Sequence, residues 1–132
     1  MSIYSLHNPA KDRHGTFPIF EKISVTTNVS GNASVTSDNY VCGELLGIIY
    51  DDGSVTTSTI AVISVTSPII LQLDSYDVNN NDAYRIPKIL TQNSGGTPST
   101  DNYSPIYLNS QITVTVTGGQ ASKTFYVYIV YK

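Results

Sequence analysis

The chain has 132 residues, of which 13% are charged and 40% are apolar, and its formal net charge is −3. This length suits a single domain, and the charged share is about half of the quarter that is usual in soluble proteins. Seven Lys and Arg against ten Asp and Glu leave no electrostatic footprint for a nucleic-acid backbone. No apolar run approaches the ~18 residues of a membrane-spanning helix. We therefore expect neither nucleic acid nor a membrane among the partners.

The composition favours strands over helices. Val, Ile, Thr, Tyr and Phe, which favour strands, together supply 54 residues, whereas the strong helix formers Leu and Ala supply only 12. The single cysteine, Cys42, excludes an intrachain disulfide framework and a multi-cysteine zinc site. Because Cys42 lies in an apolar run, we expect it to be a small buried residue.

Residues 1–21 differ from the rest, because they hold both histidines and show no regular hydrophobic period. Pro9 and Pro18 disfavour regular structure. We interpret residues 1–21 as an extended N-terminal arm, with a disordered tail as the alternative. The segment lacks the apolar region of a Sec signal peptide, so we expect none. Residues 22–132 are expected to form one β-domain.

Alternating or β-branched segments predict the first strands of this domain. They cover residues 23–29, 33–36, 41–50, 56–66 and 69–74. Turn residues at 30–32 predict a hairpin between the first two strands, and Asp51-Asp52-Gly53 predicts another hairpin.

Residues 75–110 are predicted to form a long loop, because Asn, Asp, Gly and Pro are concentrated there. Inside it, residues 84–90 predict a short edge strand that Pro87 interrupts. A loop of this length in a small domain is usually functional or an interaction element.

Two clear strands are expected near the end of the chain, at residues 111–117 and 123–131. Gly118-Gly119 between them predicts the best hairpin of the chain. The last strand is apolar or aromatic on both faces, with Tyr126 and Tyr128 on its second face. Such a strand is either central and covered on both sides, or its outer face meets a partner, although tyrosine also tolerates exposure.

These elements predict an all-β fold, an antiparallel β-sandwich of about seven or eight strands that follows the extended arm. Strand number alone leaves jelly-roll and immunoglobulin-like topologies open.

The sequence offers little for catalysis. His7 and His14 both lie in the arm, so we expect no histidine-based enzyme. Residues 77–82 resemble the start of a calcium loop, but Asp82 and Lys88 stand where an EF-hand needs Gly and Glu. An irregular Ca²⁺ site would need Asp74, Asp77 and Asp82 together, and a hydrophilic loop tip is the simpler interpretation. Strand geometry is expected to point the adjacent carboxylates of Asp51 and Asp52 apart. We expect no catalytic residue, no cofactor and no metal ion.

Candidate interface residues lie in two places. Tyr84, Arg85 and Lys88 combine aromatic and cationic side chains of the kind that anchor interfaces, although charge and Pro87 would equally protect a solvated edge strand. Tyr126 and Tyr128 are the candidates on the last strand.

Several segments resemble small virion structural proteins of tailed bacteriophages, of the head decoration or accessory type. The resemblance spans residues 22–132 and rests on short motifs: residues 23–27, the turn at 30–33, the Gly-rich strand at 43–50, and the ending at 112–117, 118–119 and 125–131. A loop with Tyr, Pro and Arg also belongs to the pattern. Here its order departs from the expected Tyr-Pro-Arg, because the chain reads Tyr84-Arg85-Ile86-Pro87-Lys88.

The resemblance implies a non-enzymatic role in a virion. We expect a capsid decoration or head accessory protein that contacts the major capsid protein or other virion proteins. The arm, the long loop and the aromatic last strand would make the contacts, and the protein would form a homo-oligomer. The alternative is a carbohydrate- or receptor-binding β-sandwich module of a fibre or cell surface.

Overall fold

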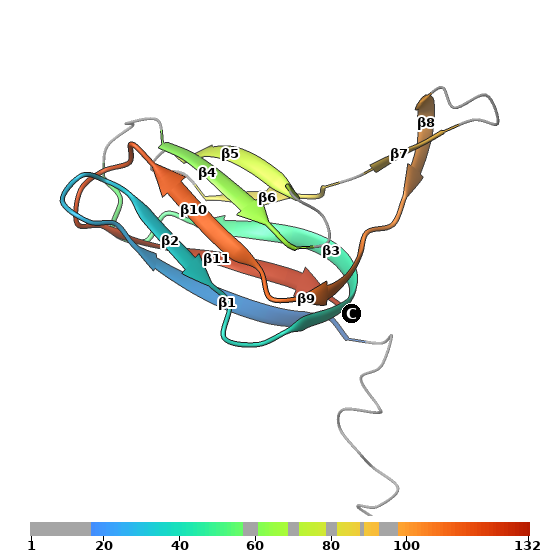
Figure 1. The fold of residues 1–132 in the computed structure, drawn as a ribbon, viewed down its shortest axis with the longest axis horizontal. Coiled ribbons are helices and arrows are strands. Elements are labelled where there is room, and N and C mark those ends of the chain that lie inside the picture. Colours follow the sequence, from blue (N-terminus) through green and yellow to red (C-terminus); the bar gives the residue numbers. More distant parts are fainter. Residues whose placement is uncertain (1–16, 57–60, 69–71, 79–81, 88, 93–97) are drawn as a thin grey trace, which may run out of the picture.

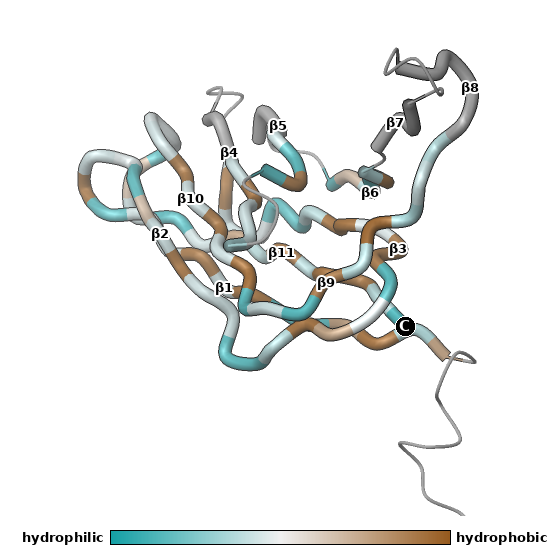
Figure 2. Tube along the Cα trace, turned by 45° about the vertical axis from the view of Figure 1, so that its right-hand side comes forward, coloured by the Kyte–Doolittle hydropathy of each residue, from teal (hydrophilic) through white to brown (hydrophobic). Residues whose placement is uncertain are grey.

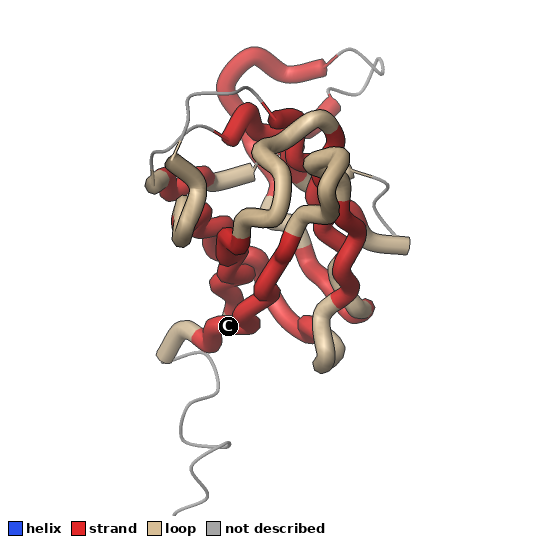
Figure 3. Tube along the Cα trace, turned by 90° about the vertical axis from the view of Figure 1, so that its left-hand side faces the viewer, coloured by secondary structure: helices blue, strands red, loops and turns tan. Residues whose placement is uncertain are grey.

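The computed structural model describes residues 17–132 apart from 57–60, 69–71, 79–81, 88 and 93–97. Eleven strands make up the regular structure of these residues, and Figure 3 shows strands and loops only. The strands are β1 (Ile19–Thr26), β2 (Ala33–Thr36), β3 (Val41–Asp51), β4 (Ala61–Thr66), β5 (Asp74–Val78), β6 (Ala83–Arg85), β7 (Ile89–Gln92), β8 (Pro98–Ser104), β9 (Tyr107–Ser110), β10 (Thr113–Thr117) and β11 (Thr124–Tyr131).

Two antiparallel sheets face each other across one core (Figure 1). Sheet A has the order β1-β11-β3-β6, and β9 pairs with the first half of β3. Sheet B has the order β2-β10-β4-β5. The β7–β8 hairpin forms a separate two-stranded sheet that projects from the sandwich (Figure 1). The predicted all-β antiparallel sandwich is confirmed.

The order in which the chain visits the sheets is that of a jelly roll. Strands β1, β3, β6 and β11 belong to sheet A, whereas β2, β4, β5 and β10 belong to sheet B. These eight strands reproduce the two interlocked Greek keys of a jelly roll, and β7, β8 and β9 form an insertion between β6 and β10. An immunoglobulin-like sandwich would keep more of its consecutive strands in one sheet.

All three predicted hairpins are wrong for the same reason. β1 pairs with β11 and not with β2, β3 pairs with β11 and not with β4, and β10 pairs with β2 and β4 and not with β11. The turn residues do reverse the chain, but each reversal carries it to the opposite sheet. Two of these turns touch, because Gly119 N donates a hydrogen bond to Gly31 O at 2.9 Å. A Cβ on Gly31 would overlap the carbonyl of Gly119, so the contact requires a glycine at position 31.

The predicted boundaries also change. The first strand covers Ile19–Thr26 and not residues 23–29, so it includes the last residues of the predicted arm. Residues 1–16 of that arm lie outside the described residues. The prediction of a long loop at residues 75–110 is wrong, since that segment contains most of β5 and all of β6 to β9. Pro87 does interrupt the extended segment there, but the single edge strand predicted at 84–90 is two short strands, which pair with different partners, β3 and β8. The predicted strand at 69–74 lies partly outside the described residues, and β5 begins at Asp74.

The core lies between the two sheets and follows the period-2 alternation of the strands (Figure 2). Sheet A supplies pairs such as Ile23 and Val25 of β1, and sheet B supplies Val114 and Val116 of β10, all at most 2% exposed. Full burial of such side chains contributes roughly 1.5–3 kcal/mol each. No helix among the described residues has the length and apolar character needed to cross a membrane.

Candidate interaction surface

The outer face of sheet A carries a row of aromatic and aliphatic side chains. The strand registers place Lys22, Tyr128, Ile49 and Tyr84 side by side across β1, β11, β3 and β6. Tyr128 and Ile49 are half-buried, and Tyr84 is 55% exposed. β11 lies between β1 and β3 and is therefore a central strand of sheet A. Its outer face is only partly covered, so the interpretation of a central strand covered on both sides holds only for its position in the sheet.

Lys22 covers part of the tyrosines next to it. Its Nζ lies 4.4 Å from the ring centroid of Tyr126 and 6.0 Å from that of Tyr128. A cation over an aromatic face is attracted by the ring quadrupole, and such a contact is worth about 0.5–1 kcal/mol at exposed sites. The ammonium group of Lys22 therefore contacts the ring of Tyr126 and lies at the limit of contact with the ring of Tyr128. The sequence did not single out Lys22, since its role depends on the pairing of β1 with β11.

Gly47 makes room for Tyr84. A Cβ at position 47 would lie 2.5 Å from the Tyr84 ring, so the ring lies directly on the backbone of β3. The Tyr84 hydroxyl donates a long hydrogen bond of 3.4 Å to Leu46 O. Phe20, 54% exposed, lies in the same transverse row as Gly47, with Val130 between them. Tyr84 and Phe20 thus extend the aromatic surface to both sides of β11.

Arg85 points away from this surface, although it follows Tyr84 in the sequence. Its Nε and Nη2 donate to the two carboxylate oxygens of Asp74 at 2.7 and 3.0 Å. The Tyr50 hydroxyl donates to the same carboxylate at 2.8 Å. Because Tyr50 and Arg85 belong to sheet A and Asp74 begins β5, this cluster ties the two sheets together. Arg85 is thus not brought together with Tyr84, and Lys88 lies outside the described residues.

A hollow of about 240 Å³ opens where the β7–β8 hairpin leaves the sandwich. Its lining is mostly apolar and includes Leu46, Ile86, Pro87 and Pro105, with Glu44 as a charged member. Ile86 is 55% exposed. Because Leu46 of β3 lines the hollow, the apolar surface of sheet A extends from β3 toward the β7–β8 hairpin.

The outer face of sheet B has a different chemistry. Every described side chain that points outward from this sheet is a serine or threonine: Ser34, Thr36, Ser64, Thr66, Ser75, Thr113, Thr115 and Thr117. Neighbouring hydroxyls pair across strands, with Oγ1 of Thr36 and Thr113 2.9 Å apart. This face offers hydroxyl groups and little apolar area.

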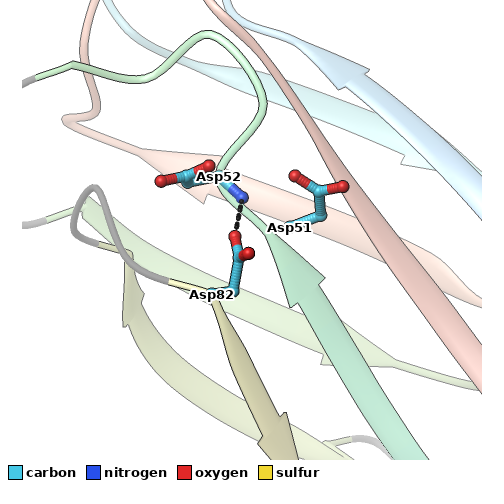
Figure 4. Close-up of side chains that lie close together, drawn as sticks. All are labelled: Asp51, Asp52 and Asp82. Carbon is cyan, nitrogen blue, oxygen red and sulfur yellow. Dashed lines mark hydrogen bonds between the residues drawn. The ribbon is translucent and has the colours of Figure 1, made fainter.

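Three carboxylates meet at the end of β3. Oxygens of Asp51, Asp52 and Asp82 all lie within 4.8 Å of one another, and Asp82 accepts a hydrogen bond of 3.0 Å from Asp52 N (Figure 4). Desolvation, together with the charges of Asp82 and Asp51, raises the pKa of Asp52. The expectation that Asp51 and Asp52 point apart is wrong, because β3 ends at Asp51 and Asp52 already belongs to the turn.

The calcium constellation considered from the sequence is not assembled in that form. Asp74 is engaged with Arg85, Asp82 joins the β3 carboxylates, and the side chain of Asp77 lies outside the described part of the chain. His7 and His14 also lie outside it.

Cys42 corrects a further expectation, since its side chain is exposed and not buried. It lies in the apolar segment of β3, but Val41 and Leu45 are the residues that face the core there. The apolar residues next to Cys42 in the sequence therefore did not predict that its own side chain is exposed.

No protein-family model, curated protein or solved structure matches this chain. The residues and their geometry are therefore the basis of the functional argument.

Proposed function

We propose that this protein is a non-enzymatic structural subunit of a virion, a capsid decoration or head accessory protein that forms a homo-oligomer. The observation that carries the proposal is the outer face of sheet A, where Tyr84, Tyr126 and Tyr128 lie together with Phe20 and Ile49. Aromatic side chains are enriched in the buried centres of protein interfaces, where charged residues are depleted.

The low charge of the chain supports this role. Burying charges in an interface costs desolvation energy, and few of the side chains described on the two outer faces are charged. Lys22 is already stacked over Tyr126, so its ammonium group can stay partly satisfied while the surrounding rings are covered. In a lattice of many identical copies, weak contacts of this kind add up to strong attachment.

The architecture is compatible with the proposal. Jelly rolls serve as viral capsid domains, although they also serve as lectins, so the fold alone does not decide between the two. The projecting β7–β8 hairpin and the segment before β1 are the further elements through which we propose contact with the major capsid protein or other virion proteins.

The test mixes the purified full chain with capsids of the virus that encodes it and measures co-sedimentation. We expect a fixed stoichiometry and at least a tenfold loss of binding for Tyr128→Glu. Thr115→Glu is the matched control, because Thr115 is a half-buried outward residue in the central region of sheet B. Capsid binding that is absent, or equally weakened by both variants, contradicts the proposal. Binding of the chain to members of a glycan array would favour the carbohydrate-binding alternative.

A further inference from the structure

The edge strands of the two sheets differ in length and protection. β2 and β5 at the edges of sheet B have four and five residues, and β6 has three. β1, at the other edge of sheet A, has eight. Proteins usually shorten, charge, bulge or cover their edge strands, because free backbone groups are a template for pairing with another chain. β1 contains no Pro or Gly and pairs in regular register with β11 on one side only.

The hydrogen-bonding pattern identifies the backbone groups at the free edge of β1. Thr27 N donates to Lys123 O at 2.9 Å, which fixes Thr27 as a residue whose backbone points toward β11. Backbone direction alternates along an antiparallel strand, so Val25, Ile23 and Glu21 also point toward β11. The N–H and C=O groups of Phe20, Lys22, Ser24 and Thr26 therefore point outward.

The side chains around this edge are suited to burial against another chain. Phe17, Ile19 and Phe20 are 56%, 41% and 54% exposed, an unusual concentration of exposed large apolar residues at one end of a strand. Lys22 is the only charged residue among the outward positions of β1.

We propose that β1 pairs antiparallel with β1 of a second copy about a twofold axis, which joins the two A sheets into one continuous sheet. A twofold interface brings the same surface of both copies together. The outward backbone donors and acceptors of β1 can pair with the same groups of a second β1. This inference deepens the proposed function, because it names a second copy as a partner and an edge as the contact.

The register follows from length and charge. Placing Ile23 opposite its own copy sets Lys22 opposite Ser24 of the partner and Phe20 opposite Thr26 of the partner. This register uses all four outward-pointing residues and forms about eight backbone hydrogen bonds. Moving the axis to Lys22 would place two ammonium groups opposite each other, which is unfavourable. Moving it further in either direction shortens the paired segment.

The experiment changes the charge at position 24 in the full chain and measures the dimer dissociation constant by sedimentation equilibrium. Ser24→Glu creates two Lys22–Glu pairs and is expected to tighten the dimer about 2- to 30-fold, whereas Ser24→Lys is expected to weaken it by a similar factor. The exchange Lys22→Glu with Ser24→Lys restores the opposite charges and is expected to recover most of the affinity. Ser34→Glu and Ser34→Lys, on the outer face of sheet B, are the matched controls.

Opposite effects of Glu and Lys at position 24, absent at position 34, are the expected result. A chain that stays monomeric at all concentrations, or a dimer that responds equally to both charges, overturns the proposal. A dimer sensitive to Tyr128→Glu but not to position 24 also overturns it, since the copies then meet face to face, and this leaves the proposed assembly role intact. Conversely, an edge-paired dimer without capsid binding contradicts the proposed function alone.

Discussion

The two outer faces of the sandwich are built on the same alternation but carry opposite chemistry. Sheet A presents tyrosines with a lysine stacked on them, whereas sheet B presents serine and threonine hydroxyls that bond to one another. The core demands apolar residues only on the inner faces, so packing does not explain the difference. The outer faces are free to be specialised, and their contrast is the strongest functional signal in the described residues.

The largest expected effect comes from the cluster that ties the two sheets together. Asp74→Ala removes the carboxylate that accepts hydrogen bonds from Arg85 and Tyr50. Because the Asp74 side chain is only 9% exposed, we expect the free energy of unfolding to fall by about 1–3 kcal/mol. Urea denaturation measures the change. Asp38→Ala, at an exposed aspartate, should leave the stability nearly unchanged, and equal losses in both variants would refute a structural role of the cluster.

A smaller effect tests the contrast between the faces directly. Tyr126→Ala removes the ring beneath the Lys22 ammonium and its cross-strand contacts, and we expect a loss of about 1–2 kcal/mol. Thr115→Ala, on the outer face of sheet B, removes a hydroxyl pair with a 3.3 Å separation at a half-buried position, and we expect at most about 0.5 kcal/mol. Thermal unfolding of both variants makes the comparison, and a larger loss at Thr115 would reverse it.

The smallest effect concerns the carboxylates at the end of β3. The raised pKa of Asp52 means that its ionised form is disfavoured in the folded chain, so the folded state is penalised at neutral pH. Asp52→Asn should therefore raise the melting temperature slightly at pH 7. The advantage should shrink as the pH falls through the raised folded pKa and vanish below the ordinary value of 3.8, where both folded and unfolded chains bind the proton.

The control for this prediction is Asp38→Asn, which removes one negative charge away from the cluster. A gain at pH 7 that persists unchanged at pH 3 would show that charge repulsion is not the cause.

The face that each residue occupies was largely predictable where the alternation is regular. Val114 and Val116 face the core and Thr113 and Thr115 face outward, as the sequence predicts for residues 111–117. Phe125, Val127 and Ile129 are likewise buried. A period of two residues is a local property of an extended chain, so it can be read without knowledge of the partners.

The sites were less predictable, because they combine residues from distant strands. Tyr84 and Arg85 are neighbours in the sequence, yet adjacent residues of a strand point to opposite sides. Tyr84 therefore lies on the outer face of sheet A, whereas Arg85 binds Asp74. Tyr126 and Tyr128 were identified from the second face of their strand. Lys22, Gly47 and Ile49 were missed, since only the registers of β1, β11 and β3 bring them to the same surface.

By itself the sequence determined the β-class, the sandwich, the low charge and the in-or-out direction of most strand residues, because these depend on composition and local periodicity. Only the tertiary structure decided which sheet each strand joins. Turn residues such as Gly118-Gly119 reverse the chain equally well within a sheet or across the core. The pairing of β11 with β1 and β3 is chosen by contacts between residues 75 to 112 positions apart. The jelly roll, the aromatic face of sheet A and the free edge of β1 all follow from that choice.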